Sequence, residues 1–227
     1  MLRWGLCQRS DYISMDFKAF IFDFDGTLVE SEHVNIAAAR QAFESFGYRL
    51  LENDHSYVVG RSSADYIPIL AEKYGIPVEL AETIRKNQRE AYQGLWDEIA
   101  TIMPDAKNTL EILKSRNKML SLATTNRIHT VEKFINAFDL HGFFSLILTQ
   151  EDVTHRKPHP EVYLLAKQRI ALSEEEILVV EDSEVGVAAA KAAGLYCAAV
   201  PNQHTRSHDF SRADYVCGSL KEILKLV

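Results

Sequence analysis

Short apolar runs alternate with helical patterns along most of the chain, and this alternation predicts the fold. The runs that predict strands cover residues 19–22, 119–123, 145–148, 177–180 and 196–200. Successive apolar positions indicate strands buried on both faces, which is typical of a parallel sheet between helices. Helical periodicity follows most of these runs, over residues 106–116, 130–137, 161–168 and 185–193, and a last strand and helix are expected at 213–216 and 220–226. We therefore predict a doubly wound, Rossmann-like α/β fold.

The interval between the first strand and Pro104 breaks this rhythm. It has helical periodicity over residues 36–43, 64–74 and 80–92, and no convincing strand. A crossover between parallel strands needs one helix, so the surplus predicts an inserted all-helical cap domain. We expect a catalytic core over 16–30 and 101–227, a cap over 31–100 and an N-terminal extension over 1–15. Segments inserted after strands of such sheets lie on the ligand-binding edge, so a cap there could select substrate.

Composition narrows the classes of partner and compartment. The 227 residues carry a net charge of −7, and an acidic protein repels nucleic acid and anionic membranes at long range. The apolar runs are too short to cross a bilayer, and residues 1–14 lack the apolar stretch of a signal peptide. We therefore expect no nucleic-acid or membrane partner; oligomeric state is left open.

The three cysteines, Cys7, Cys197 and Cys217, are far apart in the sequence and form no C-x-x-C pair. This spacing argues against a disulfide framework or a cysteine-based zinc site and fits a reducing cytoplasm. Cys197 and Cys217 lie in apolar stretches, where we expect small core residues. His204 and His208 are four residues apart, but without a supporting helix they predict a polar surface loop rather than a metal site.

Two carboxylates directly after the first strand are the strongest chemical signal. Asp23 and Asp25 are followed by Gly26 and Thr27, and strand alternation would bring both carboxylates to the same face. Two negative charges close together are costly unless a cation offsets them, and Mg²⁺ prefers a few carboxylate oxygens together with phosphate. One carboxylate could attack phosphorus while the other transfers protons. Gly26 would let backbone amides approach the phosphate.

Three further groups of polar residues are consistent with that chemistry. Thr124 and the adjacent Thr125 and Asn126 could hold phosphate oxygens after the second strand. Lys157 lies in a stiff segment, Lys157-Pro158-His159-Pro160, that would aim its ammonium at the phosphate. A second acidic pair, Glu181 and Asp182, ends another buried strand. Helix capping explains one such acid, but not acidic pairs after two strands of one sheet.

The order Asp-x-Asp-Gly-Thr, Thr, Lys-Pro and Glu-Asp-Ser resembles the haloacid dehalogenase superfamily over residues 17–225. The helical insert resembles the cap of phosphoglycolate phosphatases, sugar-phosphate phosphatases and β-phosphoglucomutases. The resemblance implies a magnesium-dependent phosphatase of a small phosphorylated metabolite that works through an aspartyl-phosphate intermediate.

The resemblance also implies a role for each motif residue. Asp23 would be the nucleophile and Asp25 the general acid and base. Thr124, or Thr125 if the register differs by one, would bind phosphate, and Lys157 would steady phosphate and nucleophile. Asp182 would ligate Mg²⁺ with Asp23 and the backbone carbonyl of Asp25, and Glu181 would be a direct or a supporting ligand.

Alternatives within and beyond the family stay open. Branches that attack carbon or cleave phosphonates lack the second aspartate, so Asp25 favours transfer of a phosphoryl group from oxygen. A β-phosphoglucomutase-type phosphomutase shares the core machinery; against it, Asn35 and Ser63 occupy positions where the mutase histidine and arginine would be expected. In the cap, Lys86, Asn87 and Arg61 could contact substrate, although an exposed basic helix face explains Lys86 and Asn87 equally well. A non-catalytic phosphate-binding module is the remaining alternative. Such a module would be free to lose the nucleophile, the general acid and base or the lysine, whereas this chain retains Asp23, Asp25 and Lys157.

Overall fold

A six-stranded parallel sheet is the centre of the larger part of the molecule. The computed structural model describes residues 16–59 and 61–227, so the predicted extension 1–15, with Cys7, lies outside the described residues. The strands stand in the order β5-β4-β1-β6-β7-β8, and all five neighbouring pairs run parallel. Their bounds are β1 Ala19–Phe22, β4 Met119–Ala123, β5 Leu146–Leu148, β6 Ile177–Glu181, β7 Tyr196–Ala199 and β8 Tyr215–Val216.

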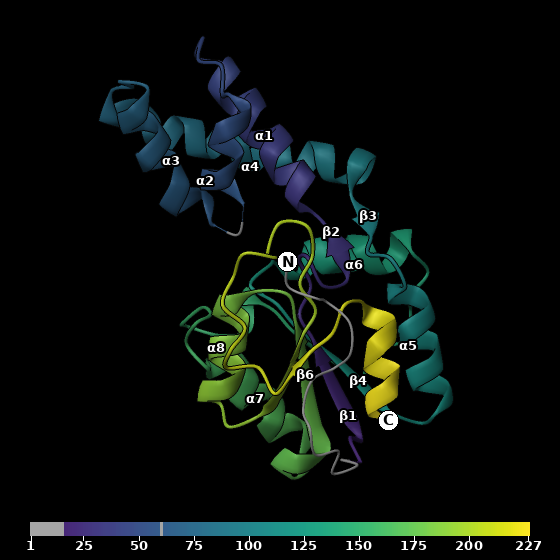
Figure 1. Ribbon diagram of the computed structural model, residues 1–227. Helices are drawn as coiled ribbons and strands as arrows, with labels where there is room; N and C mark the ends of the chain where they lie inside the picture. The colour runs from purple at the N-terminus through teal and green to yellow at the C-terminus, as the bar shows by residue number, and fades with distance from the viewer. Residues whose placement is uncertain (1–15, 60) are drawn as a thin grey trace. The chain divides into compact units, whose positions relative to one another are not determined.

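Helices cover both faces of this sheet, as a doubly wound fold requires (Figure 1). They are α5 Ala106–Ser115, α6 Ile128–Ala137, α7 Glu161–Ile170 and α8 Glu184–Ala192, with short 3₁₀ turns η2 Gln150–Asp152, η3 Glu174–Glu176 and η4 Leu220–Leu226. Figure 1 shows α7 and α8 on one side of the strands and α5 with η4 on the other. The predicted fold class is confirmed, although the last helix is a 3₁₀ helix.

Strand alternation divides the core between the two faces. Ala19 and Ile21 of β1 pack with Val179 of β6 and with Tyr163 and Val187 of α7 and α8. The intervening residues of β1 therefore point to the other face. All four residues of β1 are buried, which explains why the strand reads as a continuous apolar run.

The second unit is helical. Among the described residues, the chain divides into residues 16–29 with 102–227, and residues 30–59 with 61–101. The latter unit contains α1 Glu32–Glu44, η1 Glu52–Asp54, α2 His55–Val58, α3 Ser63–Lys73 and α4 Val78–Ile99. Its own core is built around buried aromatic and aliphatic residues, among them Phe43, Tyr66, Leu70 and Ile84.

Two short strands were missed by the sequence analysis. β2 Val29–Glu30 and β3 Thr101–Ile102 pair in a two-stranded sheet where the chain passes between the two units. The expectation of no strand before Pro104 was therefore wrong. Two residues are too few for a period-two pattern to be recognised.

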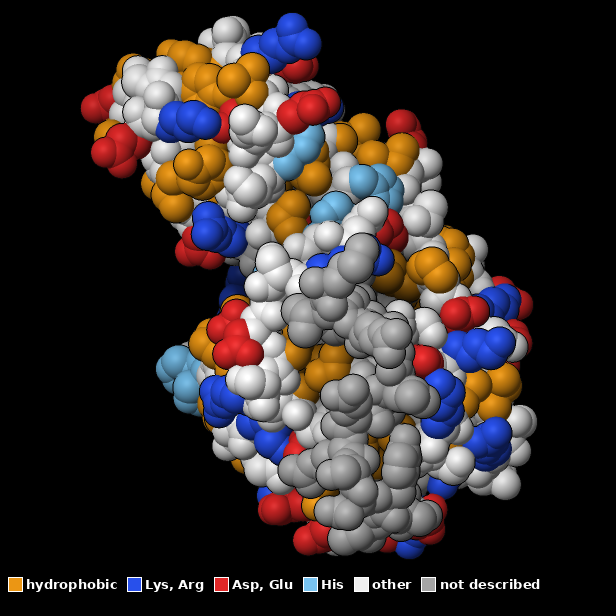
Figure 2. Space-filling model, viewed as in Figure 1, with side chains coloured by type: hydrophobic (Ala, Val, Ile, Leu, Met, Phe, Trp, Pro, Cys, Tyr) orange, Lys and Arg blue, Asp and Glu red, His pale blue; other side chains and the backbone are white. Residues whose placement is uncertain are grey.

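Surface and core composition agree with the expectations for a globular chain. Acidic and basic side chains alternate with apolar ones over the visible face (Figure 2). Cys197 and Cys217 are buried in the core, as predicted. Within the described residues, no helix combines the length and apolar character needed to cross a bilayer.

Candidate active site

The first acidic pair lies where β1 ends. The N–H of Asp23 still bonds to the carbonyl of Val180 on β6 at 2.9 Å, so Asp23 continues the line of the strand. Its residue is only 9% exposed. The chain then turns: the Gly26 N–H donates to the Val29 carbonyl at 2.8 Å, and the Leu28 N–H donates to the Phe24 carbonyl at 2.9 Å. Asp25 lies in this turn, where its carboxylate accepts a hydrogen bond from the Asn126 side-chain amide.

Lys157 joins the carboxyl ends of three neighbouring strands. Its Nζ donates to Asp23 Oδ1 at 2.6 Å after β1, to the Ala123 carbonyl at 3.0 Å on β4, and to Glu181 Oε1 at 2.7 Å on β6. The side chain is 6% exposed. A lysine ammonium has three donors, and here each one has a partner. The segment before α7 therefore places this ammonium among the carboxyl ends of three strands.

Glu181 is held by several protein groups. Besides Lys157, its Oε1 accepts from the hydroxyl of Tyr163 at 2.6 Å, and its Oε2 accepts from the hydroxyl of Ser183 at 3.2 Å. The residue is 1% exposed. Gly186 makes room for it, because a Cβ at that position would lie 1.9 Å from the Glu181 carboxylate. Both oxygens are thus already engaged by the protein.

Asp182 contacts a residue that the sequence analysis missed. Its Oδ2 accepts from the Asn202 side-chain amide at 2.7 Å, and the same nitrogen donates to the Gly26 carbonyl at 3.1 Å. Asn202 Oδ1 in turn accepts from the N–H of His204 at 2.8 Å. Asn202 follows the strand β7, so the rule that polar residues after strands gather at one edge could have found it. Tyr163, inside α7, had no such local signal.

Gly26 occupies a position that no other residue fits easily. Its φ is +73°, in the left-handed region that favours glycine. A Cβ there would lie 2.3 Å from Asp182 Oδ2 and 2.7 Å from Asn202 Nδ2. The turn after β1 therefore packs directly against the Asp182 side chain. A role of Gly26 in phosphate binding stays a prediction.

The electrostatics of this cluster favour a bound cation. One carboxylate oxygen each from Asp23, Glu181 and Asp182 lie within 4.8 Å of one another, and all three residues are buried. The pKa of Asp23 is raised to about 7, chiefly by burial and then by the charge of Glu181, while Lys157 opposes the shift. Burial alone would lower the pKa of Lys157, but the charges of Asp23 and Glu181 outweigh it and raise that pKa. Hard oxygen donors in a cluster with excess negative charge fit a divalent cation such as Mg²⁺.

The residues after β4 lie at the same edge of the sheet. Thr124 is 1% exposed, and its hydroxyl accepts from the Asn126 N–H at 3.0 Å. Thr125 and Asn126 are partly exposed. Asn126, predicted to bind phosphate, donates a hydrogen bond from its side-chain amide to the Asp25 carboxylate. It therefore orients the second aspartate, and the phosphate-binding roles of the three residues stay predictions.

The three predicted cap residues all lie in the helical unit. Lys86 has a side chain 68% exposed and faces Glu90 at 3.9 Å, and Asn87 donates to the Ser45 hydroxyl at 3.2 Å. Arg61 is exposed. Their contact with substrate stays a prediction.

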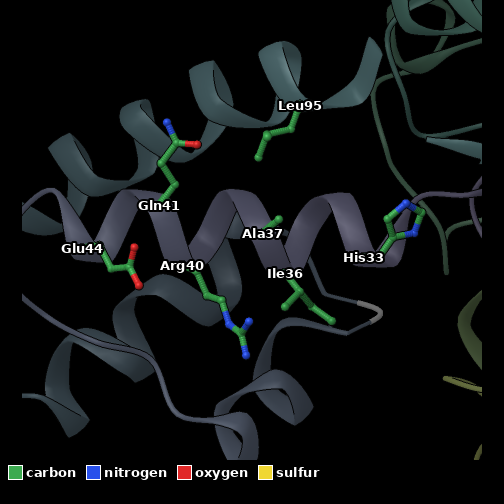
Figure 3. A pocket seen from close by; sticks show the side chains of 7 residues that line it. All are labelled: His33, Ile36, Ala37, Arg40, Gln41, Glu44 and Leu95. Carbon is green, nitrogen blue, oxygen red and sulfur yellow. The ribbon is translucent and has the colours of Figure 1, made fainter. Parts of the chain in front are cut away.

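A hollow of about 550 Å³ lies along α1 of the helical unit. Its lining residues are His33, Ile36, Ala37, Arg40, Gln41, Glu44 and Leu95. Figure 3 shows the side chains of Ile36 and Arg40 pointing to the same side of α1, with Leu95 reaching toward α1 from α4. None of the three predicted cap residues lines it. The sequence analysis did not single out this helix face.

Comparisons with known proteins place the chain in a family. A sequence model of the family described as haloacid dehalogenase-like hydrolase matches residues 20–200. A phosphorylated carbohydrates phosphatase from Thermotoga maritima is 33% identical over 178 residues, which cover 78% of this chain and 82% of that protein. A phosphoglycolate phosphatase from Vibrio parahaemolyticus is 28% identical over 224 residues, covering 93% of this chain and 96% of that one.

A solved structure agrees with the sequence comparisons. The crystal structure of a Thermotoga maritima protein provisionally assigned as a β-phosphoglucomutase superposes with a TM-score of 0.77. It is 30% identical and covers 92% of this chain and 98% of that one. The likeness extends over both units of the chain, since it covers nearly all residues.

Proposed function

The chain belongs to the haloacid dehalogenase-like hydrolase family and is a phosphatase of that family, and we propose that it hydrolyses a small phosphorylated metabolite with Mg²⁺ as cofactor. The observation that carries the proposal is the contact of Lys157 with Asp23 at 2.6 Å beside the buried acids Glu181 and Asp182. The Lys157 ammonium and a divalent cation bound by the acids would together hold a phosphate dianion. The buried Asp23 carboxylate beside them could then attack it.

The first half-reaction transfers the phosphoryl group to the enzyme. An oxygen of Asp23 attacks phosphorus, and a bond forms between that oxygen and phosphorus as the ester P–O bond breaks. Asp25 gives its proton to the departing ester oxygen, so the product leaves as an alcohol. The hydrogen bond from Asn126 keeps the Asp25 carboxyl oriented. Lys157 offsets negative charge as the nucleophile and the phosphate approach each other.

The second half-reaction releases phosphate. Asp25, now ionised, takes a proton from water, and the water oxygen attacks phosphorus while the bond to Asp23 breaks. Inorganic phosphate leaves, and both aspartates return to their starting states. Splitting the hydrolysis in this way replaces one difficult step by two easier ones.

Asp23, Asp182 and the backbone carbonyl of Asp25 would hold the Mg²⁺, which when bound offsets the charge of the transferring phosphoryl group. Glu181 suits a supporting role better than a direct one, because Lys157, Tyr163 and Ser183 already occupy its oxygens. The Asn202 amide orients the carboxylate of Asp182 by donating a hydrogen bond to its Oδ2. Residues that orient ligands in this way commonly tune metal affinity.

Sugar phosphates and phosphoglycolate are the substrate classes that the relatives support. The Thermotoga and Vibrio relatives are named for these two classes. We place the reaction in the cytoplasm, since the three cysteines are widely spaced in the sequence and form no C-x-x-C pair.

A phosphomutase is the second candidate, because the Thermotoga structure carries that provisional assignment. One contact within the helical unit favours hydrolysis. Asn35, at the position where a mutase histidine is expected, accepts a hydrogen bond from the buried Gln88 at 2.9 Å. An amide does not exchange protons as histidine does, and this one joins α1 to α4. The proton shuttle expected of a mutase is therefore missing at this position.

A panel of phosphorylated metabolites with Mg²⁺, monitored for free phosphate, tests the proposal. We expect phosphate release from a sugar phosphate or from phosphoglycolate, and its loss in Asp23→Asn. Asp139→Asn is the matched control, because Asp139 is exposed and its φ of +54° suits asparagine. Turnover in Asp23→Asn would exclude this nucleophile. Glucose 6-phosphate formed from β-glucose 1-phosphate and a bisphosphate primer, without phosphate release, would identify a mutase.

A further inference from the structure

A second group of metal-binding side chains lies on the segment that carries Lys157. Among residues 16–59 and 61–227, three or more histidine, cysteine or acidic side chains come together at two places. One is the acidic cluster described above, and the other consists of His155, His159 and Glu161. Neither histidine has a role in the proposed hydrolysis.

The geometry of this group is compact. The ligand atoms all lie within 4.8 Å of one another. His155 Nδ1 is 2.8 Å from Glu161 Oε2, His159 Nδ1 is 3.9 Å from the same oxygen, and the two imidazole rings are 4.6 Å apart between centroids. Ligand atoms around zinc lie roughly 3.3 Å apart at its usual bond lengths and tetrahedral angles. Small side-chain rotations would therefore bring the three atoms around one ion.

Glu161 is fixed in place, whereas the histidines are accessible. The Glu161 carboxylate accepts the N–H groups of Thr154 and His155, both at 2.8 Å, at the start of α7. The side chains of His155 and His159 are 63% and 51% exposed. An ion could thus reach the group from solvent and find one ligand already positioned.

We propose that His155, His159 and Glu161 form a surface site for a borderline transition metal, best suited to Zn²⁺ and separate from the acidic cluster. Two imidazoles and one carboxylate are a donor set typical of zinc with an open coordination position, whereas Mg²⁺ prefers oxygen alone. The competing interpretation is a simple ion pair of His155 with Glu161. That pair does not account for His159, whose ring lies against His155.

The position of the site gives it a structural consequence. Lys157 lies between the two histidines in the sequence, and its ammonium contacts Asp23 and Glu181. A metal bound to His155, His159 and Glu161 would close the turn that carries Lys157 and restrict its motion. The bound form should therefore show slower hydrogen exchange at the amides of this segment.

Zinc titration of the purified protein at pH 7.5 in saturating Mg²⁺ tests the site directly, because the proposed Mg²⁺ would fill the acidic cluster. We expect one equivalent of Zn²⁺ to bind by calorimetry, Co²⁺ to give the visible absorption of a four-coordinate site, and Zn²⁺ to slow exchange over residues 154–159. The double substitution His155→Gln and His159→Gln should lower zinc affinity by at least about tenfold. These readouts do not depend on turnover, so a failure here is distinct from failure of the proposed function.

The matched control removes the other closely spaced histidine pair. His204→Gln with His208→Gln takes away the same number of imidazoles, and we expect it to retain the zinc affinity of the wild type. No zinc binding in the wild type, or binding unchanged in the His155 and His159 variant, would overturn the site. Loss of binding in the His204 and His208 variant alone would move the site to that pair. His155 and His159 are both exposed, so we expect each single substitution to leave the fold intact. Lost zinc binding in these variants then reflects the lost imidazole and not a loss of folding.

Discussion

Lys157 is the residue on which the arrangement of the site depends most directly. A buried ammonium is costly unless every donor has a partner. Here the Asp23 and Glu181 carboxylates and the Ala123 carbonyl supply all three. In return, the ammonium limits the repulsion between two carboxylates that lie close together. Neither the lysine nor the acids would be stable in these positions alone.

Asn202 provides a test of metal affinity that leaves the nucleophile intact. Asn202→Ala removes the amide that donates to Asp182 Oδ2 and to the Gly26 carbonyl. We expect the Mg²⁺ concentration for half-maximal phosphate release to rise about 10- to 100-fold, because the ligand loses its orienting partner. The rate at saturating Mg²⁺ should change much less. The measurement is the Mg²⁺ dependence of turnover.

Gln203→Ala is the control for that substitution. Gln203 is the exposed neighbour of Asn202, and its loss should leave the Mg²⁺ dependence unchanged. An equal shift in both variants would show that the whole loop matters rather than the Asn202 amide. A shift in neither would rule out Asn202 as a positioning residue.

At the scale of elements, neighbouring strands bring the two acidic pairs together. β1 and β6 are paired in parallel with Phe22 opposite Val180, so Asp23 and Glu181 follow at the same level. The helix α8 then begins at Glu184, with the Ser183 hydroxyl accepting the Gly186 N–H at 3.1 Å. This close strand-to-helix turn explains why glycine is needed at position 186.

Gly186→Ala should disturb the site through this turn. The added Cβ would overlap the Glu181 carboxylate, so we expect a loss of about 1–3 kcal/mol in the free energy of unfolding and a lower rate of phosphate release. In α4, Gly94→Ala is the matched change, because no atom lies within 4 Å of a Cβ there. It should stabilise the protein by about 0.5–1 kcal/mol. Urea unfolding of both variants checks the contrast in stability, and phosphate release checks the effect on the site. A fully active Gly186→Ala protein would contradict the expected effect on the site.

The opposite edge of the sheet contains a carboxylate whose contribution depends on pH. The Glu176 carboxylate accepts hydrogen bonds from the N–H and hydroxyl of Ser173 and from the Lys18 ammonium. The contact with Lys18 joins the start of β6 to the start of β1. The hydrogen bond from Lys18 and those from Ser173 lower the pKa of Glu176 from 4.5 to about 2. Protonation therefore favours the unfolded chain. The stability that Glu176 contributes is complete above pH 4.5 and is lost as the pH falls toward about 2.

Comparison of the wild type with Glu176→Gln isolates this effect. The difference in urea midpoint between the two should be constant above pH 4.5 and should shrink below it. Phosphate release at neutral pH should be the same, because Glu176 lies at the other edge of the sheet from Asp23. A difference that persists unchanged into acid would show that the Glu176 charge is not responsible.

At the scale of the whole molecule, each unit has its own hydrophobic core, and the chain as a whole is acidic. The two cores consist of different residues, one around the sheet and one among α1 to α4. A net charge of −7 opposes the approach of a phosphate dianion. Affinity for such a substrate must therefore come from local cations such as Lys157 and the proposed Mg²⁺.

Removal of divalent metal is the corresponding prediction. Excess chelator should stop phosphate release, and added Mg²⁺ should restore it. Mg²⁺ at about 100 times its dissociation constant should raise the free energy of unfolding by about 2.7 kcal/mol, because it binds the folded state alone. Asp182→Asn should weaken both effects. Steady turnover in excess chelator would require a different mechanism.

The sequence by itself determined the class of fold, the order of the strands along the chain and the positions of the two acidic pairs. These are local properties: apolar runs report burial, and polar residues directly after them mark one edge of a parallel sheet. The sequence did not reveal the strands β2 and β3, because two residues are too few to show an alternation of buried and exposed positions. Tertiary structure alone decided which side chains meet. Asn202 reached Asp182, Tyr163 reached Glu181 and Asn126 turned to Asp25 through contacts between residues distant in the chain, and such contacts form only when strands and helices pack together.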